Sequence, residues 1–460
     1  MVLDIVIMAA GKGTRMKSAC PKVLHRLAGK TLLQHVLETA AGLGADRTIV
    51  VTGHGAEAVE REVAMIDAKA VCVRQMPQLG TGHAVQQALP ALHESGTTLI
   101  LNGDVPLTQI ATVRALLDAC AGERLALLTL TVPDASGYGR IVRDGERVTA
   151  IVEHKDASAA QREIREFYTG LMALPTAALR RWLTALTNDN AQGEYYLTDI
   201  VAMAVAQGVS VVAVAAPNET EVLGVNSPLQ LADLERRYQR RRAEALMEAG
   251  VRLADPARLD VRGELVCGSD VEIDIGCIFE GTVRLGDNVR IGANCWIRNA
   301  QIGADVDIQP FTHIDGEALG VSIGEGSRIG PFARLRPGAQ LAQDVHIGNF
   351  VEVKNSTLAR GAKANHLAYL GDATVGERVN FGAGSIVANY DGANKHRTVI
   401  GADVHVGSNC VLVAPITLGD GATIGGGSTI AKDAPAGQLT VARAKQVSLT
   451  GWTRPKKGAR

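Results

Sequence analysis

The chain has 460 residues, which is more than one hydrophobic core normally serves, so we expect two domains. Lysine and arginine (47) nearly equal aspartate and glutamate (48), and this balance excludes a global basic field that would attract nucleic acid or an anionic membrane. The seven cysteines include no CxxC pair, which argues against a disulfide framework or a zinc knuckle and predicts reduced thiols in the cytoplasm.

The first half of the chain, to about Gly224, alternates short apolar runs with helical patterns. This alternation predicts an α/β domain over residues 1–227, with a Rossmann-like, doubly wound parallel sheet covered by helices. The opening run MVLDIVIMAA is too short to span a bilayer, and we interpret it as a buried strand. Ligands of such sheets bind at the carboxyl ends of the strands. The glycine-rich stretch 8–16 and the pair at 103–104 each follow an apolar run, so we expect them to meet in one crevice.

A different pattern begins near Pro228. Residues 229–250 form an uninterrupted helix-forming stretch that ends at Gly250, a plausible carboxyl-terminal cap. We interpret residues 228–250 as a helical linker arm. Its arginines, from Arg236 to Arg242, are interpreted as a solvated helix face and receive no function.

Beyond Val251 the aliphatic residues recur every six positions, and glycine often follows them. This period predicts a parallel β-helix of hexapeptide repeats over residues 251–460, and the narrow interior explains why only 3% of the chain is aromatic. Glycines are expected at the corners of the coils. Two runs of six carry the pattern: Ile323, Ile329, Leu335, Leu341, Ile347, Val353, and Ile400, Val406, Leu412, Leu418, Ile424, Ile430.

The period is broken at residues 297–302, 364–369 and 389–397. We expect these segments to be excursions from the coil, where a regular scaffold carries chemistry. The basic tail, residues 453–460, is expected to be disordered.

The amino-terminal stretch MAAGKGTRM, followed by PKVL, lacks the spacing of a Walker P-loop, and a plain strand-to-helix turn is the simplest alternative. The whole string nevertheless resembles the signature of the sugar-phosphate nucleotidyltransferases, and QLGTGHA and NGDVP follow in that family's order. The resemblance implies UTP as substrate and Mg²⁺ as cofactor, with in-line attack of a sugar phosphate and no protein nucleophile.

The same resemblance assigns roles to particular residues. Arg15 and Lys22 would neutralise the triphosphate, and Asp104 with Asn226 would hold Mg²⁺, although a strand-end Asp is otherwise more often a helix cap. Asn102 and Tyr168 depart from the family pattern, which has Tyr and Asn at these positions. The nucleotide and sugar contacts implied by the resemblance are Met8, Ala9, Ala10, Gly11, Lys22, Gln75, Gly80, Thr81, Asn102, Gly103, Asp104, Gly139, Glu153 and Asn226.

The solenoid contains, in order, PFARLRPG, GNFVEVKN, ANHLAYLGD, NFGAGS and NYDGANKHRT. The six-residue repeat alone does not require any of these strings. Together they resemble the acetyltransferase domain of a bacterial bifunctional family, which acetylates glucosamine-1-phosphate and then uridylylates the product to UDP-N-acetylglucosamine for peptidoglycan and lipopolysaccharide. The resemblance also implies left-handed coils and a homotrimer with acetyl-CoA sites between subunits.

In that family pattern His366 is the general base, because an imidazole titrates near neutral pH, and Glu352 orients it. Lys395 would lie near the acyl-transfer region. The sugar-phosphate site would contain Arg336, Lys354, Tyr369 and Asn380, and the acetyl-CoA site Ala383, Asn389, Tyr390, Ser408, Gly426 and Arg443. Small residues such as Ala383 and Gly426 have a simpler interpretation as coil corners.

Two alternatives remain open. One is a nucleotidyltransferase whose β-helix only oligomerises, and the other is a non-catalytic interaction subunit that kept the architecture. The residues His366, Arg336, Lys354 and Tyr369 speak against the first, and Arg15, Lys22, Asp104 and Asn226 against the second.

Overall fold

The computed structural model describes residues 2–455 and 457, so four residues of the basic tail lie outside the described part. The chain divides into two compact units, one ending at Tyr238 and one beginning at Gln239. The division falls within helix α8 (Pro228–Glu248), which lies where the sequence predicts a helix. Within the described residues, no helix is long and apolar enough to cross a membrane. All seven cysteines are free thiols.

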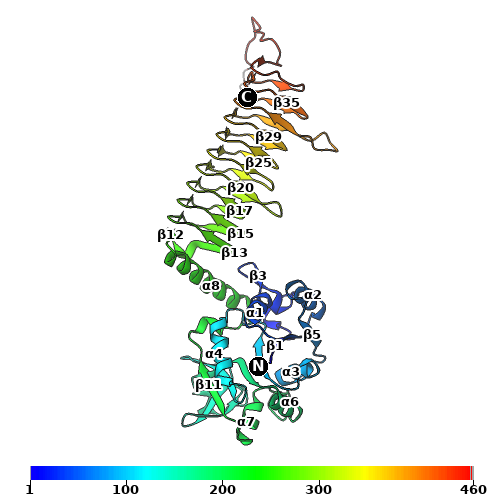
Figure 1. Ribbon diagram of the computed structural model, residues 1–460, viewed down its shortest axis with the longest axis vertical. Helices are drawn as coiled ribbons and strands as arrows, with labels where there is room; N and C mark the ends of the chain where they lie inside the picture. Colours follow the sequence, from blue (N-terminus) through cyan, green and yellow to red (C-terminus); the bar gives the residue numbers. More distant parts are fainter. Residues whose placement is uncertain (1, 456, 458–460) are drawn as a thin grey trace. The chain divides into compact units, whose positions relative to one another are not determined.

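The amino-terminal unit is built on a nine-stranded sheet whose main order is β11-β7-β10-β6-β1-β4-β5 (Figure 1). Helices pack on it to form two apolar clusters; in β1, Val6 belongs to one cluster and Ile5 and Ile7 to the other. The main strands are β1 (Leu3–Ala9), β4 (Arg47–Thr52), β5 (Val71–Arg74), β6 (Thr97–Asn102), β7 (Leu125–Thr131), β10 (Glu166–Pro175) and β11 (Val211–Ala215). The helices are α1 (Leu32–Ala41), α2 (Ala56–Ile66), α3 (Thr81–Ala88), α4 (Ile110–Cys120), α5 (Ala159–Arg162), α6 (Thr176–Thr184) and α7 (Asp199–Ala206).

The expectation of an all-parallel sheet is wrong at one place. Strand β10 runs antiparallel to both of its neighbours, β6 and β7. The chain between β7 and β10 forms the antiparallel pair β8 (Arg140–Asp144) and β9 (Arg147–Val152) and only the short helix α5, so no long crossover helix forces a parallel return. The amino-terminal part of β10, including Tyr168, therefore lies at the edge where β6 and β7 end.

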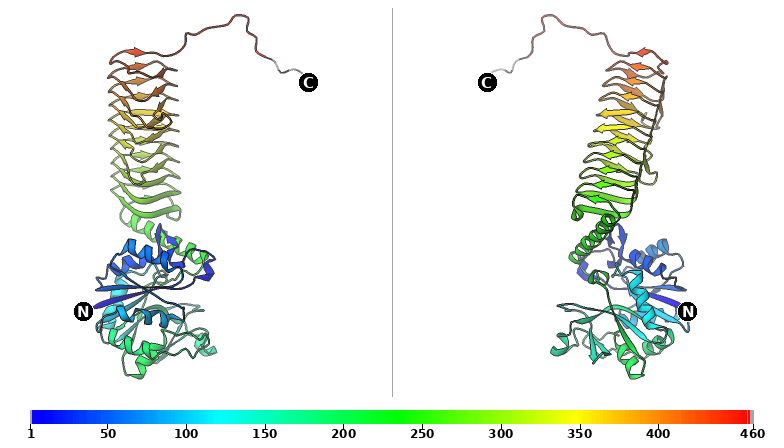
Figure 2. Two further views of the ribbon diagram at one scale, coloured as in Figure 1. Left: turned by 90° about the vertical axis from the view of Figure 1, so that its right-hand side faces the viewer. Right: turned by 60° about the vertical axis from the view of Figure 1, so that its left-hand side comes forward.

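The carboxyl-terminal unit is a parallel β-helix (Figures 1 and 2). Its eleven-stranded sheet runs from β12 (Arg252–Leu253) to β38 (Leu439–Thr440) and forms one face. The long strands β13 (Leu259–Cys267), β15 (Cys277–Leu285) and β17 (Trp296–Ile302) begin a second sheet, which continues from β17 as two columns. One column contains β22 (Arg334–Leu335), β25 (Glu352–Lys354), β28 (Tyr369–Gly371) and β31 (Ile386–Ala388), and the eleven-stranded face contains β24 (His346–Asn349), β27 (Lys363–His366), β30 (Asn380–Phe381), β33 (His405–Val406) and β36 (Thr423–Ile424).

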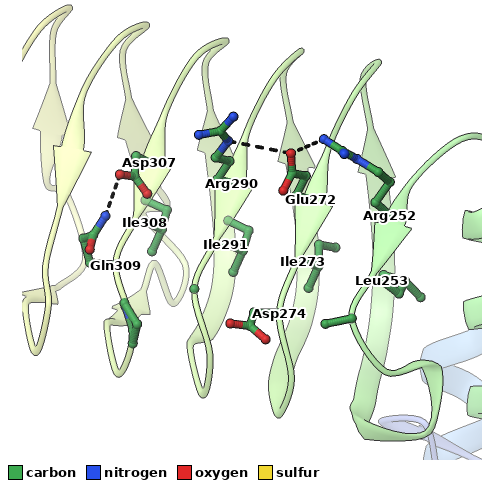
Figure 3. A pocket seen from close by; sticks show the side chains of 13 residues that line it. Arg252, Leu253, Glu272, Ile273, Asp274, Arg290, Ile291, Asp307, Ile308 and Gln309 are labelled. Carbon is green, nitrogen blue, oxygen red and sulfur yellow. Dashed lines mark hydrogen bonds and ion pairs between the residues drawn. The ribbon is translucent and has the colours of Figure 1, made fainter.

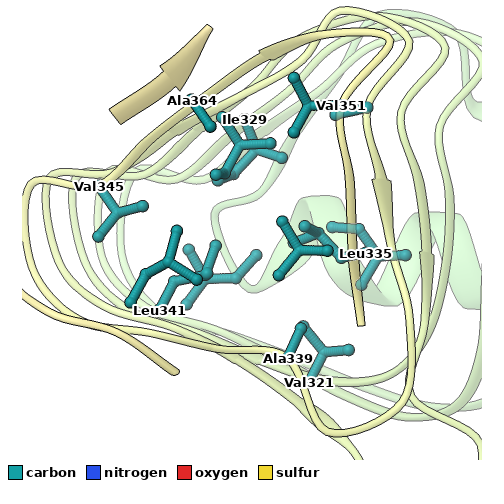
Figure 4. Packing of buried hydrophobic residues seen from close by; sticks show 14 of the residues in the cluster. Val321, Ile329, Leu335, Ala339, Leu341, Val345, Val351 and Ala364 are labelled. Carbon is teal, nitrogen blue, oxygen red and sulfur yellow. The ribbon is translucent and has the colours of Figure 1, made fainter. Parts of the chain in front are cut away.

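The six-residue period is confirmed as the core of this unit. Every member of the two aliphatic runs is buried, as are their neighbours inside the coil (Figure 4). Figure 4 shows Ile329, Leu335 and Leu341 pointing into the same interior from different faces. Small and branched aliphatic side chains fill most of this narrow space at close packing, and Phe279 and Phe381 are buried among them.

The glycines that follow the aliphatic residues mostly lie where successive coils approach closely, and the expectation that they occupy left-handed corners is wrong. Most of them lack a positive φ; instead, a Cβ at Gly286 would lie 2.7 Å from the backbone N of Ala304 in the next coil, and one at Gly407 would lie 2.5 Å from the N of Gly426. Successive coils therefore touch at these positions. The left-handed corners are taken by Asp and Asn residues such as Asn288 and Asp344 and by other glycines such as Gly326 and Gly384.

The three expected excursions have different outcomes. Residues 389–397 do leave the regular coil, with a single bridge between Tyr390 and Lys395. The expectation is wrong for 297–302, which lie in the continuous strand β17, and for 364–369, which are shared between β27 and β28. In each place one residue with a positive φ, Asn299 or Leu367, forms the corner, so the chain stays in the coil although the spacing is irregular.

Candidate active sites

In the amino-terminal unit, the loop after β1 lies beside the end of β6. Met8 and Ala9 belong to β1, and the backbone N–H of Gly103 donates to the carbonyl oxygen of Met8 at 2.9 Å. The carbonyl oxygen of Ala10 accepts from the backbone N–H of His54 at 3.2 Å, and Gly11 is exposed. The glycine-rich loop and Gly103 therefore share one edge of the sheet, as the sequence predicts.

Lys22, Asp104 and Asn226 come from three distant parts of the chain and meet at one point. The Lys22 ammonium forms an ion pair with Asp104 Oδ2 and donates to Asn226 Oδ1 at 3.1 Å. A carboxylate oxygen and an amide oxygen thus converge on a positive charge, which is the donor set that Mg²⁺ accepts from a protein. The described residues contain no cluster of three or more His, Cys, Asp or Glu suited to a metal, and Mg²⁺ commonly takes one carboxylate and completes its shell with phosphate and water.

Arg15 is exposed near this point. It lies within electrostatic reach of Tyr138, where it opposes the rise that burial and the Glu219 and Asp104 carboxylates cause in the pKa of that phenol. Gln75 is buried, and its amide donates to the carbonyl oxygen of Gly80 at 2.9 Å. Thr81 begins α3, and its Oγ1 accepts from Leu197 N–H at 3.0 Å. Gln75, Gly80 and Thr81 thus form a patch of their own.

Glu153 is a partly buried carboxylate near Gly139. Its carboxylate accepts from Thr198 Oγ1 at 3.0 Å, and burial raises its pKa. A Cβ at Gly139 would lie 3.5 Å from Glu153 Oε1, so the glycine leaves the carboxylate accessible to a ligand. This geometry suits hydrogen bonds with sugar hydroxyl groups.

The two departures from the family pattern lie close together. Asn102 ends β6, and its amide packs against Gly170 of β10, two residues from Tyr168. The Tyr168 hydroxyl is buried without a hydrogen-bond partner, and burial and the Glu153 carboxylate raise its pKa. Sequence reasoning could not see this proximity, because it depends on the antiparallel course of β10.

In the solenoid, Arg336 and Lys354 lie on the column of β22, β25 and β28, and Lys395 approaches them from the excursion at 389–397. Arg336 donates to Glu352 Oε1 at 2.8 Å. The nearby Lys395 ammonium and partial burial lower the pKa of Lys354, while Asp372 opposes this effect. Tyr369 follows Glu352 in the next coil of the same row. The cations outnumber the acids here, which suits a doubly charged phosphate.

His366 is exposed at the end of β27 and is not in an excursion. Its Nδ1 lies 2.7 Å from Asn349 Oδ1. Glu352, the residue expected to orient it, instead accepts from Arg336 and, at 3.4 Å, from Arg334. The expected contact between Glu352 and His366 is therefore absent among the described residues, and Asn349 takes that place.

The expected acetyl-CoA residues stack directly above His366. Backbone N–H groups of the following coils donate to the carbonyl oxygens of His366 (3.2 Å), Ala383 (2.8 Å) and Ser408 (2.8 Å) at equivalent corner positions. Gly426 is the next member, and Arg443 Nη1 donates to its carbonyl oxygen at 2.7 Å. These residues therefore form a row of small side chains along successive coils, and the row begins at His366.

The other residues predicted for the acetyltransferase site are Asn380, Asn389 and Tyr390. Asn380 begins β30 on the eleven-stranded face. Its amide donates to His405 Nδ1 at 3.2 Å. Asn389 is buried and donates to Asp372 Oδ2 at 2.5 Å, so it also supports the coil. Tyr390 is exposed on the excursion that carries Lys395. Sequence reasoning missed Asn349 and Asp372, because both look like ordinary corner residues.

A hollow elsewhere on the eleven-stranded face contains none of these residues (Figure 3). Glu272 forms ion pairs with Arg252 and Arg290, and Gln309 donates to Asp307 Oδ2 at 2.5 Å. Several of the charged groups therefore pair with one another across successive coils.

Comparison with known families assigns both units. Residues 5–253 match the MobA-like NTP transferase domain. Residues 320–355 and 397–432 match the bacterial transferase hexapeptide (six repeats), and residues 282–309 match the hexapeptide repeat of succinyl-transferase.

Full-length relatives decide the family. The chain is 72% identical to "Bifunctional protein GlmU" of Methylibium petroleiphilum over 99% of this chain and 100% of the relative. The protein of the same name from Polaromonas naphthalenivorans is 68% identical over 99% and 98% of the two chains, and that from Cupriavidus pinatubonensis is 58% identical over all of both. The chain belongs to the GlmU family. It is a bifunctional uridylyltransferase and acetyltransferase of UDP-N-acetylglucosamine synthesis, which serves cell-wall precursor formation.

Proposed function

We propose that the two activities occupy the two sites described above, with uridylyl transfer in the amino-terminal unit (residues 1–227), acetyl transfer in the solenoid (251–460), and residues 228–250 as the arm between them. The single observation that supports this most strongly is the column above His366. A candidate base, a row of small residues and the cation cluster around Lys354 lie in neighbouring coils of the solenoid. A scaffold used only for oligomerisation would need none of these.

In the amino-terminal site, the phosphate oxygen of N-acetylglucosamine-1-phosphate attacks the α-phosphorus of UTP in line, and pyrophosphate leaves. Arg15 and Lys22 neutralise the triphosphate, which lies against residues 8–11 and Gly103. Gln75, Gly80 and Thr81 contact the uracil. The sugar lies against Gly139 and Glu153, and Asn102 and Tyr168 shape that end of the site.

Asp104 and Asn226 would hold Mg²⁺, because their oxygens already converge on the Lys22 ammonium. When bound, the ion would neutralise charge on the phosphates. Lys22 then moves its positive charge from Asp104 to the triphosphate, so that the same ammonium stabilises the site without substrate and serves the reaction with it.

In the solenoid, Arg336, Lys354 and Lys395 hold the phosphate of glucosamine-1-phosphate, and Tyr369 and Asn380 contact the sugar. His366 Nε2 removes a proton from the amine as its nitrogen attacks the thioester carbonyl of acetyl-CoA. The carbon–sulfur bond breaks and coenzyme A leaves as the thiol. The coenzyme lies along Ala383, Ser408 and Gly426, with Arg443, Asn389 and Tyr390 beside it.

The assembly proposed for this reaction is a homotrimer. Four large apolar side chains, Phe311, Phe332, Phe350 and Leu367, are about half exposed in successive coils and all have left-handed backbone, which is unusual for bulky residues. The phenyl rings stack at 5.0 and 5.3 Å, and the row ends beside His366. An exposed apolar row of this kind is typical of an interface, and a second copy placed there would border the acetyl-transfer site.

The free thiols and the absence of a membrane-spanning helix among the described residues support a cytoplasmic location.

The direct test is synthesis of UDP-N-acetylglucosamine by the purified chain from glucosamine-1-phosphate, acetyl-CoA, UTP and Mg²⁺. We expect product and one coenzyme A released for each pyrophosphate. Accumulation of N-acetylglucosamine-1-phosphate alone would contradict the amino-terminal assignment, and absence of coenzyme A release would contradict the solenoid assignment.

A further inference from the structure

A side chain at the end of a neighbouring strand contacts the candidate base. Asn349 ends β24 and His366 ends β27, and the two residues are direct partners in the parallel register. Asn349 Oδ1 lies 2.7 Å from His366 Nδ1. The distance is that of a strong hydrogen bond between neutral groups.

The chemistry of the pair fixes the proton on the imidazole. An amide oxygen carries no hydrogen and can only accept, so Nδ1 must be the protonated nitrogen. Nε2 then carries the lone pair, and this is the nitrogen that can remove a proton from a substrate amine. The hydrogen bond therefore selects both the tautomer and the direction in which the base presents its lone pair.

The backbone around the pair is held rigidly. Leu367 N–H donates to the carbonyl oxygen of Asn349 at 3.0 Å, and Gly384 N–H donates to that of His366 at 3.2 Å. A side chain at Gly348 would collide with the backbone of Asn365, so the two coils touch directly below the imidazole. Asn349 can thus hold the ring in place without moving itself.

We propose that Asn349 is a positioning residue for acetyl transfer, acting through His366 by holding its Nδ1–H tautomer. This inference rests on the proposed role of His366. Glu352 is occupied by Arg336 and Arg334, so its contribution is to hold the phosphate-binding arginine.

Two substitutions at this position separate positioning from simple structural support. Asn349→Ala removes the acceptor, and we expect kcat for acetyl transfer to fall by about tenfold, which is less than the 10²–10⁴-fold that the general base itself contributes, while KM for both substrates changes little. Asn349→Asp keeps an acceptor at the same place and should restore much of kcat. Its carboxylate favours the imidazolium form, so the acidic limb of the kcat/KM profile should move to higher pH.

Asn288→Ala is the matched control. Asn288 is a corner residue whose amide donates to Asp305 in the next coil at 3.1 Å, far from the predicted site residues in the sequence. Its left-handed backbone makes the alanine substitution structurally more demanding than that at Asn349. We expect this variant to lose thermal stability but to keep kcat.

The proposal is overturned if Asn349→Ala keeps its kcat, if Asn288→Ala loses as much, or if the pH profile of Asn349→Asp superimposes on that of the parent. His366→Ala in the same assay distinguishes these failures from failure of the proposed function. Retained acetyl transfer in His366→Ala would mean that His366 is not the base, whatever Asn349 does.

Discussion

Lys22 in the amino-terminal unit and Lys354 in the solenoid are both candidates for binding phosphate, but their surroundings differ. Lys22 is paired with the Asp104 carboxylate and an amide oxygen, whereas Lys354 faces Lys395 and Arg336, which lower its pKa. The first site is neutralised by its own acid, and that acid is the one that would hold Mg²⁺. The second keeps an excess of positive charge that a phosphate dianion would neutralise.

The two sites should therefore respond differently when a phosphate ligand binds. At the first, UTP and the cation must separate an existing ion pair, so binding of the two is expected to be linked. At the second, Arg336 is already paired with Glu352, but Lys354 lies near Lys395 and Arg336, and a phosphate relieves the repulsion between these cations. Substitutions that act on one site only can test this difference.

The largest effect is expected from His366→Ala. Loss of a general base costs about 10²–10⁴-fold, so acetyl transfer should become almost undetectable. Release of coenzyme A, followed with a thiol reagent, measures this directly. Uridylyl transfer to supplied N-acetylglucosamine-1-phosphate serves as the control and should be unchanged.

The next effect concerns the exposed aromatic row. Phe350→Asp places a charge beside Phe332 on the proposed interface, and burying an unpaired carboxylate is strongly unfavourable. We expect dissociation of the oligomer and a loss of acetyl transfer of more than about tenfold, measured by light scattering and by coenzyme A release. The control is Leu319→Asp, an exposed residue on a turn outside the row, which should leave both unchanged. A dissociated protein with full acetyl transfer would show that one chain carries a complete site.

A core substitution tests whether the two units are energetically separate. Ile329→Ala leaves a cavity in the solenoid interior, and such changes cost about 2–5 kcal/mol. Thermal unfolding followed by calorimetry should show a lower Tm for the solenoid transition, with uridylyl transfer at 25 °C intact. Equal loss of uridylyl transfer would contradict the separation.

The smallest effect is a shift of pH dependence. Because Lys395 and burial lower the pKa of Lys354, this lysine loses its charge at a lower pH than an ordinary lysine, and KM for glucosamine-1-phosphate should rise as the pH rises through that pKa. In Lys395→Met the pKa of Lys354 moves upward, so the rise in KM should begin at higher pH. KM at neutral pH should increase a few-fold through the lost cation. An unchanged alkaline limb would contradict the coupling of these two ammonium groups.

The sequence predicts much of this organisation, for physical reasons that particular residues show. The buried run from Ile323 to Val353 is visible because a narrow coil repeats one steric requirement every six residues. The direction of β10 cannot be read from its sequence, because it depends on which strands β10 pairs with. That direction brings Tyr168 near Asn102. The hydrogen bond between Asn349 and His366 joins residues one coil apart, and no local pattern distinguishes Asn349 from other corner residues.

We propose that one chain carries two separate catalytic sites, and that N-acetylglucosamine-1-phosphate released by one site can be used by the other. The most direct measurement supplies glucosamine-1-phosphate, acetyl-CoA, UTP and Mg²⁺ to Asp104→Ala, to His366→Ala and to a mixture of the two proteins. Asp104→Ala should accumulate N-acetylglucosamine-1-phosphate, His366→Ala should form no product, and the mixture should make UDP-N-acetylglucosamine. Loss of both activities in either variant, or a mixture that remains inactive, would contradict the account.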